Sequence, residues 1–123
     1  MREAADALCS DPTGPRTLAA VRRVHRRLTD QLLPHEYAEE HQLYPALAVP
    51  LGGSEATVPM SRAHAEIERL ARRIAAHLSI VDASGTGLRA EQTEDLRACL
   101  YGLHTVLKLH FAQEEENYFS LAR

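Results

Sequence analysis

Three long stretches of the chain repeat apolar residues in steps of three and four, and this pattern constrains the fold more than any other feature. Such steps gather the apolar side chains on one face of an α-helix. Clusters of helix-breaking residues at positions 50–54 and 82–87 separate the stretches. Short loops between long amphipathic helices predict an all-α, up-down antiparallel bundle. A chain of 123 residues fits one such domain, residues 1–123.

The apolar face of each stretch can be followed along the sequence. The first face comprises Leu18, Val21, His25, Leu28, Leu32, His35, Glu39, Leu43 and Ala46. The second comprises Met60, His64, Ile67, Ala71, Ile74, Leu78 and Val81. The third comprises Leu96, Leu100, Leu103, Leu107, His110, Glu114, Tyr118 and Leu121. Because Pro34 removes a backbone donor from the first stretch, we expect a kink just before His35.

A fourth helical piece lies ahead of these stretches and is much shorter. Residues 2–9 precede a cluster of Pro and Gly and allow only about two helical turns. A four-helix bundle with one short helix leaves part of its core uncovered. We therefore expect either that the first helix begins upstream in a larger chain, or that a second copy in a homodimer covers the gap.

Charge and composition argue against several classes of function. A formal net charge of -3 gives little attraction to nucleic acid or to an anionic membrane. No apolar run approaches the roughly 20 residues that a membrane-spanning helix needs. The N-terminus has acidic residues and no apolar stretch, so it does not resemble a signal peptide, and we expect a cytoplasmic protein. The basic run at residues 22–27 is interpreted as a solvated helix face, because no aromatic residues are interleaved with it.

Polar residues occupy several positions that the helical periodicity assigns to the core. These are His35, Glu39, His64, His110 and Glu114. A buried carboxylate without a partner is costly, and glutamate is almost never fully buried unless it is paired. A metal ion is the simplest partner for several such groups at once.

The spacing of these residues supports a metal site. His35 and Glu39, His64 and Glu68, and His110 and Glu114 form three pairs, each four residues apart. Residues at i and i+4 share one helix face, and in an up-down bundle all three pairs fall toward the same end. Three imidazoles and three carboxylates make a set of nitrogen and oxygen ligands that suits iron, manganese or zinc. Carboxylates can also bridge two ions, which favours a dinuclear site.

Other interpretations remain for individual residues. A single His/Glu pair is common on a solvated helix face, so the metal interpretation depends on three pairs at matching levels. Glu68 lies at the edge of its apolar face, beside Ile67, and could equally face solvent. Glu115 competes with Glu114 as a ligand, since a carboxylate side chain has a flexible reach.

The remaining histidines and the cysteines are given structural roles. His25 is interpreted as a core or supporting residue, His104 as a residue that orients a neighbour, and His41 and His77 as exposed. Cys9 and Cys99 are too few for a zinc framework and are interpreted as small buried residues. A disulfide or a reactive thiol is the less favoured alternative.

Two sequence blocks and one isolated histidine carry a resemblance to a known family. The first block is His35-Glu36-Tyr37-Ala38-Glu39-Glu40, followed by Leu43-Tyr44-Pro45. The second block is His110-Phe111-Ala112-Gln113-Glu114-Glu115, followed by Tyr118-Phe119, and His64 lies between the blocks near the start of a predicted helix. Together they resemble the hemerythrin-like family of HHE cation-binding domains, over most of the chain from about Leu18 onward.

The resemblance implies a four-helix bundle with a non-haem di-iron site, often bridged by oxygen and by two carboxylates. By this resemblance Glu39 and Glu114, or Glu115, would be the bridging carboxylates, and His35, His64 and His110 would be terminal ligands. Members of the family bind oxygen reversibly, sense oxygen or iron, or handle peroxide and nitric oxide. Such domains also occur at the soluble ends of metal-transporting P-type ATPases and signalling proteins, which implies a regulatory role within a larger protein.

The sequence departs from the family's pattern at two points. The first helix of the family normally contributes a histidine, and residues 1–9 contain none. Oxygen-carrying members have His-x-x-x-His in the third helix, whereas this chain has His64 and Glu68. Fewer imidazoles favour sensing or redox chemistry over reversible oxygen carriage, with O2 or small anions as ligands of the iron. We therefore expect a di-iron binding or sensing domain; the alternatives are a di-iron oxidase or peroxidase and, less favoured because Cys ligands are lacking, a structural zinc site.

Overall fold

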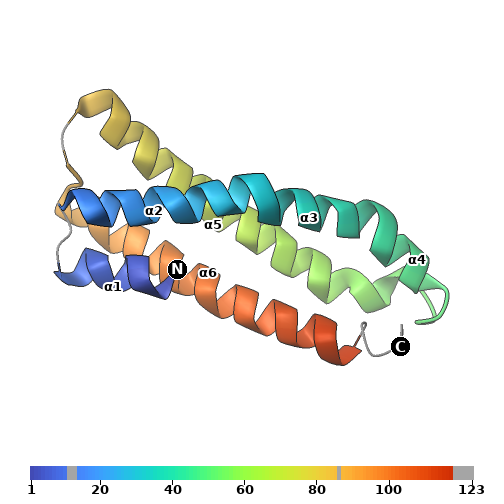
Figure 1. Cartoon of the computed structure of the whole chain (residues 1–123). Helices are drawn as coiled ribbons and strands as arrows, with labels where there is room; N and C mark the ends of the chain where they lie inside the picture. The colour runs from blue at the N-terminus through green and yellow to red at the C-terminus, as the bar shows by residue number, and fades with distance from the viewer. Residues whose placement is uncertain (11–13, 86, 118–123) are drawn as a thin grey trace.

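A computed structural model of the chain describes residues 1–10, 14–85 and 87–117. Every regular element within these ranges is helical (Figure 1). The elements in chain order are α1 Arg2–Ser10, α2 Pro15–Arg27, η1 Leu28–Leu32, α3 Leu33–Ala38, η2 Glu39–Leu43, α4 Tyr44–Ala48, η3 Ser54–Thr57, α5 Val58–Ser84 and α6 Ala90–Asn117. The predicted all-α fold is therefore confirmed.

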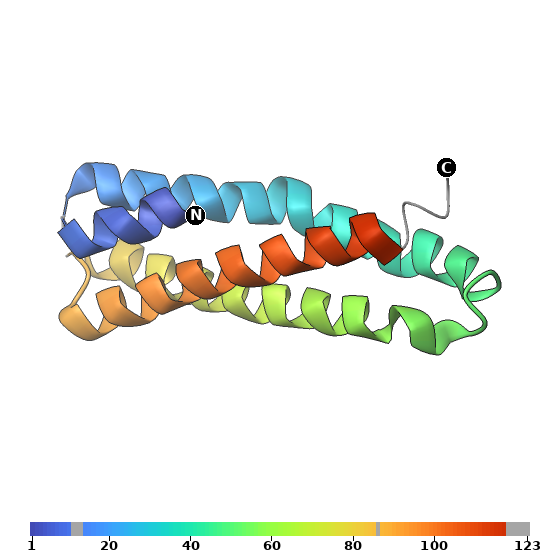
Figure 2. The ribbon, with the colours of Figure 1, turned by 90° about the horizontal axis from the view of Figure 1, so that it is seen from below.

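The helices form an antiparallel bundle in which neighbours alternate in direction. The elements from α2 to α4 follow one another without a break and make a single rod, which lies beside α5 and α6 (Figure 1). The short helix α1 packs against α2 and α6 near one end of the bundle only (Figure 2). Three long helical rods and a short first helix are the arrangement that the sequence predicted. None of the described helices is long and apolar enough to cross a membrane.

Two wide π-helical turns interrupt the rod, and a proline lies two residues after the end of each. The backbone N–H of Leu33 donates to the carbonyl of Leu28, and that of Tyr44 donates to the carbonyl of Glu39, five residues back in each case. Pro34 and Pro45 follow these donors. A proline has no N–H to donate, and its ring clashes with the carbonyl four residues earlier, so a wider turn accommodates it without ending the helix.

The wide turns change which residues face the core. Each carries an extra residue, so the buried face moves forward along the sequence relative to uninterrupted helical spacing. The sequence placed His35 and Leu43 on this face, and for His35 that prediction was wrong, since its side chain is 63% exposed. Glu36 and Tyr44, the residues that follow them, are buried instead, while Leu43 is partly buried.

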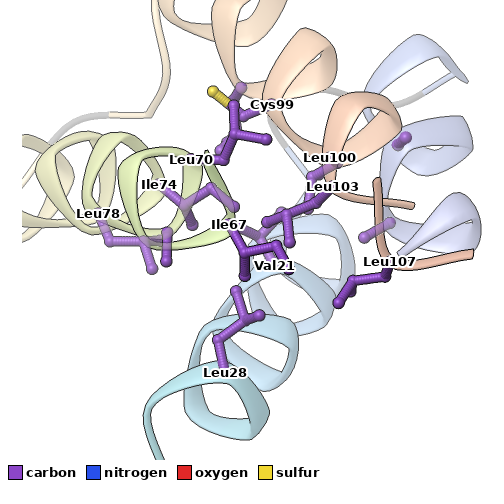
Figure 3. Close-up of a cluster of buried hydrophobic side chains, with 14 of the residues drawn as sticks. Val21, Leu28, Ile67, Leu70, Ile74, Leu78, Cys99, Leu100, Leu103 and Leu107 are labelled. Atoms are coloured by element: carbon purple, nitrogen blue, oxygen red, sulfur yellow. The ribbon is translucent and has the colours of Figure 1, made fainter. Parts of the chain in front are cut away.

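An apolar core fills the bundle between α2, α5 and α6 (Figure 3). Its fully buried members include Val21, Leu28, Ile67, Ile74, Leu96, Leu100 and Leu103. Cys99 is buried among them as a free thiol, as predicted, whereas the side chain of Cys9 lies outside the described residues. A smaller apolar cluster around Tyr44 and Met60 lies near the loop between α4 and α5. The polar residues of the candidate site lie in the part of the bundle between these two clusters.

Core packing predicts a large difference between two leucines of α6. Leu100 is fully buried and Leu109 is 59% exposed. Leu100→Ala removes buried methyl groups and leaves a cavity, so we expect it to lower the free energy of unfolding by about 2–5 kcal/mol. The control Leu109→Ala should change it by less than about 0.5 kcal/mol. Urea unfolding followed by circular dichroism measures both, and equal midpoints for the two variants would contradict this packing.

Candidate metal centre

Four buried side chains converge inside the bundle from three different helical segments. Glu39 comes from η2, His64 from α5, and His110 and Glu114 from α6. Each offers one ligand atom, and these atoms all lie within 4.8 Å of one another. The four residues are 1–6% exposed. Such a cluster could hold a metal ion, and all four members were singled out from the sequence.

The two imidazoles are turned toward each other through the same ring atom. The Nε2 atoms of His64 and His110 lie 3.0 Å apart, with the rings at 65° to each other. Glu114 Oε1 lies 3.0 Å from the same nitrogen of His110, and Glu39 Oε1 lies 3.6 Å from that of His64. Two ring nitrogens and two carboxylates therefore face one small volume, as ligands of a common cation do.

The opposite side of His64 is held by a carboxylate. His64 Nδ1 lies 2.8 Å from Glu40 Oε1, and the hydroxyl of Ser61 donates to Glu40 Oε2 at 2.8 Å. Since a carboxylate can only accept, the Nδ1 atom carries the proton and Nε2 keeps its lone pair. Histidines that bind metal usually donate their other N–H in this way, because the contact fixes both tautomer and ring orientation.

Tyr44 is a member of the site that the sequence analysis missed. It is 4% exposed, its hydroxyl donates to Glu114 Oε1 at 3.0 Å, and its oxygen lies 3.2 Å from His64 Nε2. Burial and the neighbouring charges of Glu39 and Glu114 raise the pKa of Tyr44 well above its ordinary value, so the phenol stays protonated. Tyr44 entered the sequence analysis only as part of a motif, because helical spacing put Leu43 on the buried face.

The two carboxyl groups of the cluster have opposite pKa shifts. Burial, a hydrogen bond to Glu114 and the charge of Glu114 raise the pKa of Glu39 to about 9. Burial alone would also raise the pKa of Glu114, but hydrogen bonds with His110, Glu39 and Tyr44 lower it to about 2. The pair therefore shares one proton at neutral pH, which a bound cation would displace.

Glu36 is the second buried residue that the sequence analysis missed. It is 4% exposed, and its Oε1 atom has no hydrogen-bond partner among the described residues. Burial, followed by the charges of Glu114, Glu40 and Glu68, raises the pKa of Glu36 to about 8. The nearby Pro34 is the sequence signal that could have indicated the burial of Glu36. A proline within a helical pattern often marks a place where the helical register changes.

Two residues of the predicted ligand set lie outside the cluster. His35 is mostly exposed, but its Nε2 atom is 3.6 Å from Glu39 Oε1, so it borders the site. Glu68 is 57% exposed and pairs with Arg72 at 2.8 Å, on the solvent side of α5. Of the two competing residues Glu114 and Glu115, Glu114 is buried in the cluster and Glu115 is exposed.

The other histidines have varied surroundings. His41 is exposed, as predicted, and its ring stacks on Tyr37 with the centroids 3.9 Å apart. The prediction that His77 is exposed was wrong, since its side chain is 14% exposed. Its Nε2 atom lies 2.6 Å from Asp95 Oδ2, and this contact between α5 and α6 makes burial of the ring tolerable. His25 and His104 are half-buried.

Imidazoles and carboxylates that converge inside an antiparallel helical bundle define a metal-binding bundle protein. Residues 1–122 match the family described as the hemerythrin HHE cation binding domain. The chain belongs to this family, and the resemblance stated above is confirmed over a longer range that includes α1. Comparisons with curated proteins and with solved structures gave no match.

The raised pKa of Glu39 predicts how the metal-free protein responds to pH. Its carboxyl group is protonated in the folded state up to about pH 9 but ionised in the unfolded state above its ordinary pKa of 4.5. The stability it contributes is thus complete below pH 4.5 and declines by at most about 1.4 kcal/mol per pH unit as the pH rises from 4.5 to 9. Urea titrations in EDTA measure this decline.

A variant isolates the contribution of Glu39 to this decline. Glu39→Gln stays neutral at every pH, so the slope of stability against pH between 7 and 9 should become shallower. The control Glu94→Gln removes an exposed carboxylate far from the cluster and should keep the slope of the natural sequence. Equal slopes for the two variants would show that Glu39 is not protonated in the folded protein.

Proposed function

We propose that this chain holds a non-haem iron centre of two ions and uses it to bind or sense oxygen or metal. The observation that carries the proposal is the meeting of the Nε2 atoms of His64 and His110 with the carboxylates of Glu39 and Glu114 inside a buried volume. Membership in a family of cation-binding domains supports the same proposal. The identity of the metal as iron, and the number of ions, are inferences from ligand chemistry and from the family resemblance.

The donor set fits iron better than structural zinc. Two imidazoles and two carboxylates without a cysteine are hard and borderline ligands, which suit iron or manganese, whereas structural zinc favours cysteine and histidine. Glu39 Oε2 is buried and has no hydrogen-bond partner within the described ranges, as expected of an atom whose natural partner is a cation. When bound, iron would supply reversible binding and reduction of oxygen.

Each residue has a defined part in this proposal. His64 and His110 would be imidazole ligands, and Glu39 and Glu114 would be bridging carboxylates. His35 would complete the set from the exposed edge, where its Nε2 atom already lies 3.6 Å from Glu39. Glu68 would join only by leaving its ion pair with Arg72.

The surroundings of the ligands support a small, weakly polar external ligand. The hydrogen bond from His64 to Glu40 fixes the tautomer of His64. The protonated hydroxyl of Tyr44 donates to Glu114. A groove of about 490 Å³ runs from the start of α1 past His35, between Leu32 on one side and Leu107 and Phe111 on the other. Its largely apolar walls would admit O2 to the exposed edge of the centre.

The same groove is where a partner would act on the centre. The helix α1 covers only one end of the bundle (Figure 2). The groove that begins beside its start therefore has no helical cover among the described residues. An attached part of a larger protein, or a second copy of the chain, would close it and respond to the state of the centre. A regulatory domain in the cytoplasm, where Cys99 stays reduced, fits this arrangement.

A di-iron oxidase or peroxidase is the second candidate function. The phenol of Tyr44 beside the ligands favours it, because a protonated hydroxyl can supply a hydrogen bond or a proton to a bound oxygen species. Catalytic consumption of peroxide by the iron-loaded protein would favour the enzyme. Stoichiometric binding of azide with a spectral change, without peroxide turnover, would favour the binding or sensing domain.

Reconstitution with iron tests the proposal. The protein loaded with ferrous iron in air should hold two irons per chain and show the absorption bands of an oxo-bridged ferric pair. His110→Ala removes a ligand from the middle of the cluster and should lower the iron content by at least half. The control His41→Ala removes an exposed imidazole and should keep both the irons and the bands. A colourless protein without iron, equally stable with and without His110, would contradict the proposal.

A further inference from the structure

We infer that the two cation positions are chemically unequal: His64 and His110 serve one, and the carboxylates of Glu36 and Glu39 form an oxygen-only second position beside it. This inference rests on the proposed function, since it divides the same centre into two halves. It assigns a ligand role to Glu36, which lies outside the four-residue cluster and outside the ligand set predicted from the sequence.

The first observation is a pair of buried carboxylate oxygens without hydrogen-bond partners. Among the described side chains, the buried carboxylate oxygens in this condition are Glu36 Oε1 and Glu39 Oε2. Their residues are 4% and 5% exposed. Native proteins pair nearly all buried polar atoms, so two such oxygens close together along the chain point to a missing partner.

The second observation is the placement of these two residues on one helix face. Glu36 and Glu39 are three positions apart, and residues with this spacing are neighbours on a helix surface. The wide turn that ends at Leu32 brings Glu36 onto the buried face in place of His35. Glu36 and Glu39 are therefore neighbours on the buried face of this helical rod.

The third observation is that the two oxygens of Glu39 have different surroundings. Its Oε1 atom lies 3.6 Å from His64 Nε2 and 3.6 Å from His35 Nε2, so this oxygen belongs to the imidazole half. Its Oε2 atom has no hydrogen-bond partner in the part of the chain that the structure describes. Glu39 can therefore join the two halves through a bridging carboxylate, and Glu36 adds a further oxygen to the second half.

The electrostatic surroundings of Glu36 favour a cation there. Three further carboxylates, those of Glu114, Glu40 and Glu68, lie close enough to Glu36 to act on it electrostatically. No ion pair within the described part of the chain joins Glu36 to an arginine or lysine. A divalent cation would relieve this repulsion, and carboxylate oxygens prefer hard ions such as Mn²⁺ or Fe³⁺.

Titration with Mn²⁺ tests this division. The metal-free full chain is titrated without oxygen, and free Mn²⁺ is measured by electron paramagnetic resonance. The natural sequence should bind two Mn²⁺ per chain, and Glu36→Gln, which keeps size and shape, should bind one or hold the second at least tenfold more weakly. Glu94→Gln is the matched control and should keep two. The spectrum of a coupled Mn²⁺ pair should disappear only in Glu36→Gln.

Each outcome separates this inference from the proposed function. If the natural chain and Glu36→Gln both bind two ions with the same affinity, Glu36 is not a ligand. The inference about Glu36 is then wrong, while the proposed function still stands. If the natural chain and Glu36→Gln each bind one ion equally well, the second position does not exist. If the natural chain binds no metal, the proposed function fails with it. If Glu36→Gln does not fold, Glu36→Asp tests the inference instead. Its shorter carboxylate should lower the affinity for the second Mn²⁺ ion and leave the affinity for the first unchanged.

Discussion

A carboxylate that is buried among apolar helices must be neutralised, and this constraint governs the polar end of the bundle. Glu36, Glu39 and Glu114 are each buried to more than nine-tenths, and Glu39 and Glu114 lie beside imidazoles rather than beside lysine or arginine. Shared protons can satisfy part of this need, as the opposite pKa shifts of Glu39 and Glu114 indicate. In the described part of the chain, two buried carboxylate oxygens still have no hydrogen-bond partner. A cation satisfies the whole group at once, because it replaces the shared protons and accepts the remaining lone pairs.

The two ends of the bundle bury different kinds of side chain. The end that holds α1 packs leucines, isoleucines and valines around residues such as Ile74 and Leu100, and it contributes most of the buried apolar surface (Figure 3). The other end buries imidazoles and carboxylates in place of apolar side chains. A small apolar cluster around Tyr44 and Met60 lies beyond them. Such an arrangement tolerates a costly polar site because the apolar end holds the helices in place independently of any ion.

The sequence predicted most of the fold and the central part of the site for simple reasons. The one proline of α5, Pro59, lies in its first turn, and α6 contains none. Helical periodicity is therefore uninterrupted around the site, and the buried positions of His64, His110 and Glu114 followed directly from spacing. In the second rod the same rule failed for His35, because the wide turns before Pro34 and Pro45 move the buried face to Glu36 and Tyr44. The exposure of His77 could not be judged from its own helix, since its partner Asp95 lies on α6.

X-ray absorption at the iron edge tests the central claim most directly, because it reports the atoms around the metal without requiring activity. The account predicts a metal–metal signal, nitrogen and oxygen neighbours only, and outer scattering from imidazole rings that declines in His110→Ala. A spectrum without a metal–metal signal and without imidazole scattering would contradict a dinuclear centre built on these histidines and glutamates.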